Sequence, residues 1–189
     1  KQLAVYFIMG TQNVIAREPL VMLEEALQAG VTMFQFREKG NGTLTGAAYE
    51  QFACDCQTLC KKYHVPFIVN DDVDLAIKLQ ADGVHIGQDD GVVAQVKKKI
   101  GHMMLGVSVH TMTEVAEAVA CGADYVGIGP ISPTKSKADA QTPAGTAFLQ
   151  QVTKAYPHLP IVAIGGITEE NAYLPLTAGA DGVAVISTI

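Results

Sequence analysis

The sequence lacks an excess of basic residues, and this absence excludes one broad class of function. It contains 13 Lys and Arg residues against 19 Asp and Glu residues, which gives a net charge of −6. Proteins that bind nucleic acid through its phosphates need clustered cations, so we expect no nucleic-acid partner. Small phosphate ligands stay compatible with this charge, because a few well-placed cations and backbone amides outweigh a weak negative field.

The sequence also lacks a membrane-length apolar run and a disulfide framework. No segment offers the roughly 20 consecutive apolar residues of a spanning helix, and no secretory signal is visible, so we expect no membrane partner. Three of its four cysteines, Cys54, Cys56 and Cys60, crowd one helical stretch without a zinc-binding spacing. We interpret them, with Cys121, as structural thiols of a protein in the reducing cytoplasm.

Apolar residues are abundant, and they recur in a pattern. The hydrophobic fraction of 49% suffices for the core of one large domain, and composition gives no reason to divide residues 1–189. A turn built on Gly or Ala, with Asp in three of four cases, precedes a short apolar run at residues 28–30, 81–82, 122–124 and 179–181. Each unit indicates a helix closed by a small residue, then a turn, then a buried strand.

Eight apolar runs predict strands, near residues 3–9, 32–38, 66–70, 83–87, 103–109, 125–130, 160–165 and 182–187. Helical patterns fill the gaps, near residues 19–29, 45–63, 72–80, 91–100, 112–121, 144–156 and 168–178. Eight buried strands alternating with helices favour an α/β fold, a closed (β/α)8 TIM barrel, over an open sheet. No eighth helical pattern follows, and we expect that this helix belongs to the full protein and is missing from this chain.

Two cations and an amide share one face of the second strand. In Gln35-Phe36-Arg37-Glu38-Lys39 the side chains alternate, so Gln35, Arg37 and Lys39 point one way and the other two point the opposite way. A strand inside a barrel cannot leave Arg and Lys unpaired, and a diphosphate is a natural counter-charge. A solvated edge strand would show the same pattern, but we favour a functional site.

Acidic residues follow the next two strands. Asn70-Asp71-Asp72 ends the third strand, and Asp89-Asp90 follows the fourth. Acids at adjacent strand ends can converge on Mg²⁺, which takes one or two carboxylates and completes its shell with water and substrate phosphate. We assign Asp71 and Asp90 to the metal, and we interpret Asp72 and Asp89 as helix caps or surface residues.

Two further loops suggest phosphate contacts. Residues 129–137, after the sixth strand, are rich in hydroxyls and lysines, which is typical of a lid although ordinary loops share this composition. Gly165-Gly166, after the seventh strand, would let backbone N–H groups approach an oxyanion, where barrels often bind phosphate; a tight bend alone would also explain these glycines. We interpret His85 as a polar residue inside the barrel and His110 as a cap or supporting group. No Ser-His-Asp or Cys-His arrangement is defensible.

Together these motifs resemble the thiamine phosphate synthase family over essentially the whole chain. Seven segments occur in the family's order: Q-F-R-E-K, V-N-D-D, V-H-I-G-Q-D-D, G-V-S-V-H, Y-V-G-I-G-P-I-S-P-T-K-S-K, V-A-I-G-G-I and A-G-A-D-G-V-A-V-I-S. The resemblance implies a Mg²⁺-dependent transferase that joins an aminopyrimidine diphosphate to a thiazole phosphate and releases pyrophosphate. One departure is Thr134-Lys135-Ser136-Lys137, where the family commonly shows T-x-T-K; Ser keeps the hydroxyl.

The resemblance also implies roles for matching residues. The pyrimidine diphosphate is assigned to Gln35, Phe36, Arg37, Glu38, Lys39, Asn70, Ser108 and Lys137. The thiazole phosphate is assigned to Thr134, Lys135, Ser136, Gly166, Ile186 and Ser187. The metal is assigned to Asp71 and Asp90, and catalysis to Arg37, Lys39, Lys137 and Ser108. No strong general base is implied, because the thiazole nitrogen is already a nucleophile; stabilisation of the leaving pyrophosphate dominates.

Two alternatives stay open at this point. A thiazole tautomerase shares the fold, but that relative carries a His where this chain has Pro130, and it generally lacks the paired metal acids. A non-catalytic phosphate-ligand sensor would use only the loops after the last two strands. The partners expected in each case are small molecules, and the sequence leaves a homo-oligomer open.

Overall fold

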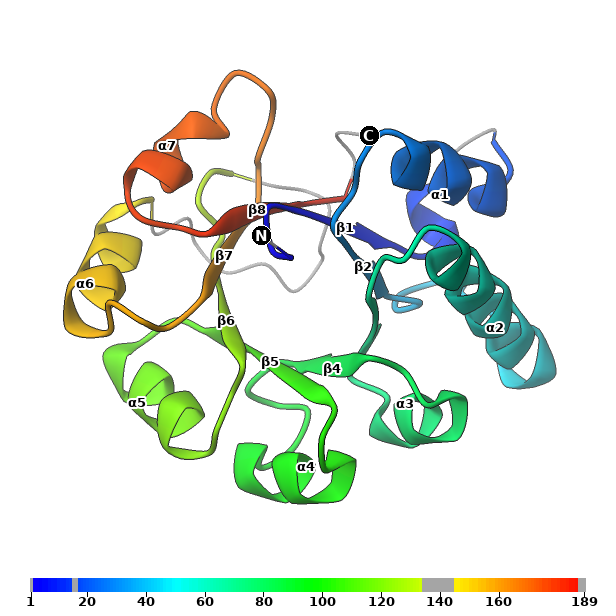
Figure 1. Ribbon diagram of the computed structural model, residues 1–189, viewed down its shortest axis with the longest axis horizontal. Coiled ribbons are helices and arrows are strands. Elements are labelled where there is room, and N and C mark those ends of the chain that lie inside the picture. Colours follow the sequence, from blue (N-terminus) through cyan, green and yellow to red (C-terminus); the bar gives the residue numbers. More distant parts are fainter. Residues whose placement is uncertain (1, 15–16, 134–144, 187–189) are drawn as a thin grey trace.

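Eight parallel strands close into a barrel whose strand order follows the sequence (Figure 1). A computed structural model describes residues 2–14, 17–133 and 145–186. The strands are β1 (Val5–Met9), β2 (Met33–Phe36), β3 (Phe67–Asn70), β4 (Gly83–Ile86), β5 (Met104–Val109), β6 (Tyr125–Ile128), β7 (Ile161–Ile164) and β8 (Gly182–Val185). β8 returns to β1 in parallel register, with Val183 beside Val5. The predicted barrel and its eight strands are confirmed.

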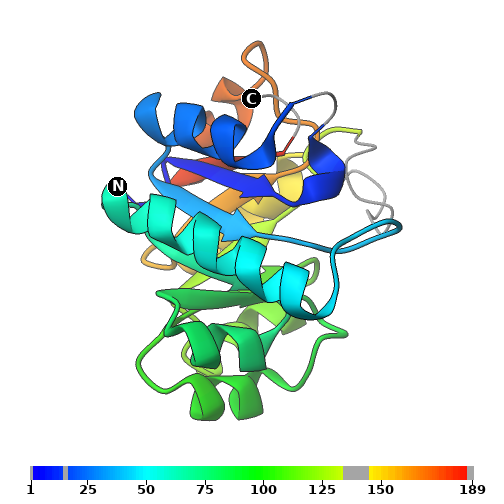
Figure 2. The ribbon, with the colours of Figure 1, turned by 90° about the vertical axis from the view of Figure 1, so that its right-hand side faces the viewer.

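Helices surround the barrel (Figure 2). They are α1 (Pro19–Gln28), α2 (Gly46–Lys62), α3 (Val73–Leu79), α4 (Val93–Ile100), α5 (Met112–Ala120), α6 (Ala147–Ala155) and α7 (Tyr173–Thr177), with a 3-10 turn, η1 (Thr11–Asn13), between β1 and α1. Each lies within a predicted helical segment except η1, which is too short to produce a periodic pattern. The helix α7 is shorter than predicted, and it contains Pro175, which cannot donate a helical hydrogen bond.

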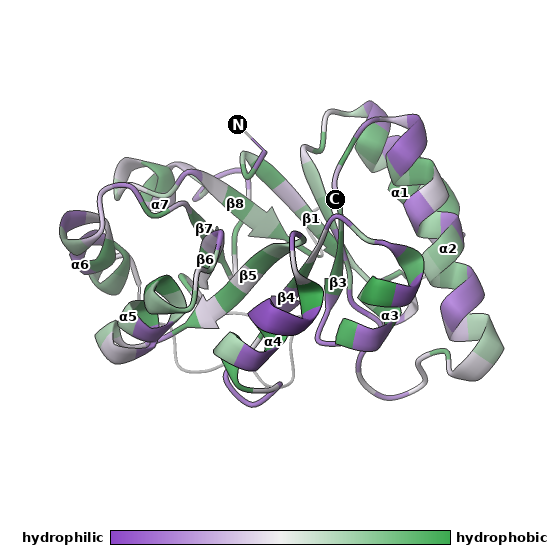
Figure 3. Ribbon diagram, turned by 60° about the horizontal axis from the view of Figure 1, so that its bottom comes forward, coloured by the Kyte–Doolittle hydropathy of each residue, from purple (hydrophilic) through white to green (hydrophobic). Residues whose placement is uncertain are grey.

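The strand residues are buried on both faces of the sheet, and this explains why they form largely apolar runs, which are mainly green in Figure 3. One cluster fills the barrel interior: Leu3, Tyr6, Ile8, Met33, Ile68, Tyr125, Val162, Ala184 and Ile186. The larger cluster lies between strands and helices and includes the three neighbouring rings of Phe34, Phe36 and Phe67. Alternation along each strand therefore decides which residues can reach a ligand inside the barrel.

The repeated turn has a structural role at the amino ends of the strands. A carboxylate just before an even-numbered strand accepts a hydrogen bond from an N–H at the start of the preceding strand. Three pairs do so at 2.8 Å: Asp82 with Phe67, Asp124 with Leu105, and Asp181 with Ile161. The hydroxyl of Thr32 accepts from the N–H of Val5 at 3.0 Å in the same way. The repeat thus satisfies backbone donors that strand pairing leaves over.

The four cysteines carry unpaired thiols, and Cys56 and Cys60 are buried against the barrel. Burial raises the pKa of the Cys60 thiol to about 12, so it stays protonated and inert at neutral pH. These positions fit the interpretation of the cysteines as structural. Within the described ranges, no helix combines the length and apolarity needed to cross a membrane.

Candidate active site

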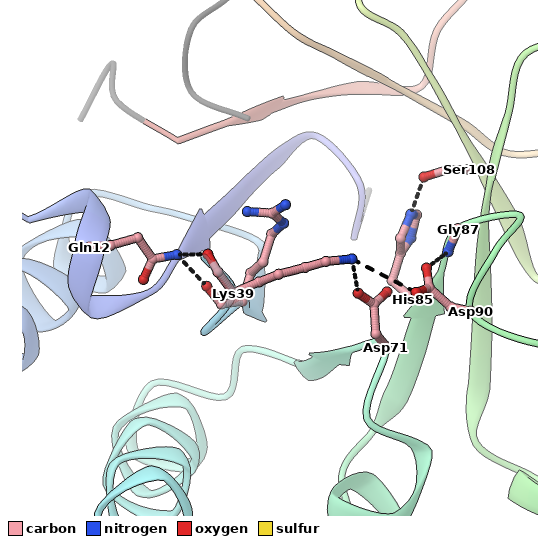
Figure 4. Close-up of polar contacts among 8 residues, drawn as sticks. Gln12, Lys39, Asp71, His85, Gly87, Asp90 and Ser108 are labelled. Atoms are coloured by element: carbon pink, nitrogen blue, oxygen red, sulfur yellow. Dashed lines mark hydrogen bonds and ion pairs between the residues drawn. The ribbon is translucent and has the colours of Figure 1, made fainter. Parts of the chain in front are cut away.

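Polar side chains gather where the strands end, at the carboxyl face of the barrel (Figure 4). Arg37 and Lys39 follow β2, Asp71 follows β3, and Asp90 lies in the loop after β4. Ser108 projects from β5, on the same side as His85 of β4. This is the face on which barrel enzymes place their chemistry.

The alternation predicted for β2 continues past its end. Gln35 and Arg37 are buried, at 1% and 6% exposure, while the Lys39 side chain is half-exposed at the mouth. Phe36 points outward and packs against the rings of Tyr49 and Phe52, with centroids 5.5 and 5.6 Å away. The side chain of Phe36 therefore faces the helices, away from the barrel interior.

Glu38 also turns away from the barrel interior, and it holds two loops together. Its carboxylate accepts hydrogen bonds from the Thr11 N–H at 2.7 Å and the Leu44 N–H at 2.8 Å, and from the Thr11 hydroxyl. Thr11 begins η1, and Leu44 precedes α2. Glu38 thus anchors the segment that carries the two cations.

Gln12, also in η1, holds the same segment through its backbone, and sequence reasoning missed it. Its Nε2 donates to the carbonyl oxygens of Arg37 at 3.1 Å and Lys39 at 2.9 Å (Figure 4). The backbones approach closely here, since a Cβ on Gly10 would lie 2.1 Å from the Arg37 carbonyl oxygen. No sequence signal marks this contact, because residues 10–13 resemble an ordinary polar loop.

Asp71 and Asp90 converge on one ammonium group. Lys39 Nζ lies 2.8 Å from Asp71 Oδ2 and 3.8 Å from Asp90 Oδ1. Asp90 is held by the N–H of Gly87, which donates to Oδ2 at 2.8 Å. Burial raises the pKa of Asp71; the hydrogen bond from Lys39 opposes that rise, and the neighbouring Asp90 adds to it. Two carboxylates and one ammonium group leave a net negative charge, which favours the binding of a further cation.

The neighbouring acids lie elsewhere, as predicted. Asp72 caps α3 by accepting a hydrogen bond from the Leu75 N–H at 2.9 Å, and Asp89 is exposed. Asn70 ends β3 and is half-buried. In the part of the chain that the structure describes, no group of three or more His, Cys, Asp or Glu residues is placed to hold a metal. Mg²⁺ often uses only one or two carboxylates, so the pair is sufficient for that ion.

A chain of hydrogen bonds runs through the barrel interior from β2 to β5. Gln35 Nε2 donates to the Tyr6 hydroxyl at 2.8 Å, and the hydroxyls of Tyr6 and Tyr125 are 2.8 Å apart. His85 then links Tyr125 to Ser108, with Nδ1 3.1 Å from the phenol oxygen and Nε2 2.9 Å from the serine Oγ. The position of His85 inside the barrel agrees with the sequence prediction. Sequence reasoning missed both tyrosines, although each is a polar tip in an apolar strand.

The loops after β6 and β7 run side by side. Gly165 and Gly166 both have left-handed backbones, with φ of +93° and +63°, and a Cβ on Gly165 would lie 2.5 Å from Pro130 Cβ. The Ser132 N–H donates to the Gly165 carbonyl at 3.0 Å. Asn171, which sequence reasoning missed, donates to the Gly166 carbonyl at 2.7 Å. The paired glycines therefore serve close packing here, whatever ligand they meet.

Of the remaining assigned residues, the structure describes Ile186, which is buried and belongs to the interior cluster. His110, interpreted above as a cap or supporting residue, lies before α5, and its backbone N–H donates to Glu114 Oε2. The other assigned residues lie outside the described residues: Thr134, Lys135, Ser136, Lys137 and Ser187.

Comparisons with known proteins give this site a context. A family model described as thiamine monophosphate synthase matches residues 5–189. The thiamine-phosphate synthase of Lysinibacillus sphaericus is 64% identical over 189 residues, which cover all of this chain and 89% of that protein. The Bacillus cereus enzyme of the same name is 55% identical, with 86% of its length covered. The solved structure of a thiamine phosphate pyrophosphorylase from Pyrococcus furiosus superposes with a TM-score of 0.87 at 33% identity, over 98% of this chain and 86% of that chain.

Proposed function

The chain belongs to the thiamine monophosphate synthase family, and from that premise we propose how its barrel performs the reaction. It is a transferase of thiamine biosynthesis that forms thiamine phosphate. The tautomerase and sensor alternatives find no support among these relatives. Our proposal concerns the residues that bind a pyrimidine diphosphate, its metal and a thiazole phosphate.

The observation that carries the proposal is the meeting of Arg37, Lys39, Asp71 and Asp90 at one mouth of the barrel. The half-exposed ammonium of Lys39 lies between two carboxylates, and the buried Arg37 stands two residues before it after the same strand. A diphosphate bound there would receive a fixed, planar donor from Arg37 and a mobile charge from Lys39. The two acids, Asp71 and Asp90, would then be available to hold a divalent cation.

The residues present fit Mg²⁺. Lys39 lies within 4 Å of both carboxylates, so both already surround one positive charge. Hard oxygen ligands of this kind suit Mg²⁺, and water and substrate oxygens would complete its shell. Mg²⁺ held by Asp71 and Asp90 would supply charge stabilisation to the leaving pyrophosphate.

The chain's own residues then need only bind and stabilise. With the acids engaged, Lys39 can turn on its flexible stem from Asp71 to the diphosphate, while Arg37 stays in place. Ser108 and Gln35 hold the pyrimidine ring inside the barrel mouth. No residue has to remove a proton from the thiazole nitrogen, which attacks as a free nucleophile. Loss of one preorganised hydrogen-bond donor to developing negative charge typically costs about 10²–10³ in kcat.

The thiazole phosphate belongs, in this proposal, to the loops after β7 and β8. Gly166 and Ile186 lie at the ends of those strands, and Asn171 fixes the Gly166 carbonyl. The assignments of Thr134, Lys135, Ser136 and Ser187 to this ligand, and of Lys137 to the pyrophosphate, rest on the family resemblance. A cytoplasmic location is supported by the four unpaired cysteines.

The proposal is tested by calorimetric binding of an inert pyrimidine diphosphate analogue, with and without Mg²⁺, to the wild type, Asp90→Asn and Asp89→Asn. Asp89 is the adjacent, exposed acid and serves as the matched control. We expect Mg²⁺ to increase the affinity of the wild type and of Asp89→Asn for the analogue by the same factor. In Asp90→Asn this factor should be smaller by at least about tenfold, because one metal ligand is weakened. Equal Mg²⁺ dependence in all three proteins would contradict the metal assignment.

A further inference from the structure

The hydrogen-bond chain inside the barrel has two ends that line one cavity. Gln35 and Ser108 both line a narrow space of about 10 Å³ at the barrel centre, with Tyr6 and His85 beside them. Gln35 is 1% exposed, and its Oε1 has no hydrogen-bond partner among residues 2–14, 17–133 and 145–186. A buried acceptor of this kind is costly unless a ligand satisfies it.

The orientation of the Gln35 side-chain amide gives the chain a direction in which each hydroxyl proton finds an acceptor. Gln35 Nε2 can only donate, so the Tyr6 oxygen accepts there, and the Tyr6 proton goes to the Tyr125 oxygen. The Tyr125 proton is then directed to His85 Nδ1. Burial raises the pKa of both phenols far above neutrality, so each keeps its proton to donate.

The direction of the chain determines the tautomer of His85 and the orientation of the Ser108 hydroxyl proton. Because His85 Nδ1 accepts, the neutral imidazole carries its proton on Nε2 and donates it to Ser108 Oγ. Ser108 therefore keeps its own proton for a group in the cavity. One end of the chain presents an acceptor, Gln35 Oε1, and the other presents a donor, the Ser108 hydroxyl.

We propose that Tyr6, Tyr125 and His85 are positioning residues that set this polarity, and that the polarity selects an aminopyrimidine over an oxopyrimidine. An aminopyrimidine offers an amino donor to Gln35 and a ring-nitrogen acceptor to Ser108. The oxo analogue reverses the pattern, with a carbonyl acceptor and a ring N–H donor. The cavity is too small for a whole ring, so it receives the ring's polar edge. The inference rests on the proposed placement of the pyrimidine.

Two glycines make the chain possible by leaving its space empty. A Cβ on Gly106 would lie 2.2 Å from Tyr125 Cζ and 2.5 Å from His85 Nδ1. A Cβ on Gly127 would lie 3.2 Å from His85 Cε1. Both positions face the barrel interior, where any side chain would displace the tyrosine or the imidazole. The chain is thus packed from several strands at once, which holds its members in one arrangement.

The first test needs no ligand. Long-range ¹H–¹⁵N spectra of the protein labelled at histidine report which ring nitrogen of His85 carries the proton, with His85→Gln used for assignment. We expect a neutral ring protonated on Nε2 in the wild type. A ring protonated on Nδ1 would reverse every bond in the chain and overturn the inference. The result is independent of whether the proposed function is correct.

The second test measures selection. Competitive inhibition constants are compared for a 4-amino and a 4-oxo pyrimidine, each with a CH2 group in place of the oxygen that joins the pyrimidine methylene to the diphosphate, so that the C–O bond broken in the reaction is absent and neither compound reacts. We expect the wild type to prefer the amino compound by on the order of 10⁴, as sites built around hydrogen bonds do. In Tyr6→Phe and Tyr125→Phe the Gln35 amide can flip, and the preference should fall at least about tenfold. Tyr63→Phe, at a hydroxyl bonded to Glu24 outside the barrel, is the matched control and should leave it unchanged.

The outcomes distinguish failure of the proposed pyrimidine placement from failure of the proposed role of the hydrogen-bond chain. If neither compound competes with substrate in the wild type, the placement of the pyrimidine is wrong and the inference falls with it. If the amino compound binds but its preference is the same in wild type, Tyr6→Phe and Tyr125→Phe, the placement stands and the inference is wrong. A purely structural role would lower the melting temperature of these variants without changing the preference.

Discussion

Asp71 occupies a position that is unfavourable for the protein without ligands. Its backbone is left-handed, with φ of +63°, and the carboxyl is partly buried beside Asp90, which raises its pKa. Such a residue destabilises the fold unless a ligand uses it. The metal role proposed for Asp71 would account for this position, because a bound cation would offset the burial of its charge.

We therefore predict that Asp71→Asn stabilises the unliganded protein while it abolishes Mg²⁺-dependent activity. Asn tolerates a left-handed backbone and carries no charge to repel Asp90, whereas the lost ion pair with half-exposed Lys39 is weak. The expected gain is about 0.5 kcal/mol in the free energy of unfolding, measured by urea titration alongside an activity assay. A large loss of stability with retained activity would show that Asp71 stabilises the fold and is not needed for Mg²⁺-dependent activity.

The pH dependence of this residue has a definite sign. Because folding raises the pKa of Asp71, the folded protein binds a proton more tightly than the unfolded chain does. Its contribution to stability is therefore best below its ordinary pKa of 3.8 and declines as the pH rises through the raised value. The difference in unfolding free energy between Asp71→Asn and wild type should grow over that interval; a constant difference would contradict the raised pKa.

Gln12 acts on the two cations through their backbone. Removing its amide in Gln12→Ala releases the carbonyls of Arg37 and Lys39, so we predict an increase of about tenfold in KM for the pyrimidine diphosphate, as misplacement of binding groups produces. Steady-state kinetics with Gln51→Ala, on the exposed face of α2, provide the control. Equal KM values for the two variants would rule out this role.

Residue-scale predictions from sequence succeeded where strand alternation applies and failed where a contact crosses loops. Alternation correctly separated Gln35 and Arg37 from Phe36, because a strand fixes the direction of each side chain. The contacts of Gln12 and Asn171 depend on how two loops approach each other, and no local pattern encodes that approach.

At the scale of elements, the turns at the amino ends of the strands give the barrel a two-strand repeat. Each Asp before an even-numbered strand satisfies a backbone N–H of its neighbour. The sequence pattern revealed the repeat, because small residues and Asp stand at equivalent turns. It did not reveal the bond, because the acceptor and donor are 15 to 20 residues apart in the sequence.

We predict that Asp82→Ala lowers the free energy of unfolding by about 1–3 kcal/mol, since it leaves the Phe67 N–H without its acceptor at the barrel's rim. Activity of the folded fraction should be unchanged, because this end lies opposite the site. Asp74→Ala removes an exposed carboxylate paired with Lys99 and should cost within about 0.5 kcal/mol. Denaturation midpoints that coincide for the two variants would refute the capping role.

At the scale of the molecule, the closed barrel brings residues from β2, β3, β4 and β5 to one mouth. The number of apolar runs, eight, predicted closure, and closure then placed Lys39 beside Asp71 and Asp90. What the sequence could not supply is the interior hydrogen-bond chain. It joins residues up to 119 positions apart, and it exists only because Gly106 leaves the space that Tyr125 fills.

The central claim is that the mouth of this barrel joins the two substrates by stabilising a departing pyrophosphate with Mg²⁺. The most direct measurement is pyrophosphate release from the pyrimidine diphosphate, with and without the thiazole phosphate, in Mg²⁺ and in chelator. We predict release that requires both substrates, stops with chelator and returns when Mg²⁺ is restored. Release that persists in chelator, or its absence while the thiazole phosphate still binds, would contradict the roles proposed for Asp71, Asp90 and Lys39.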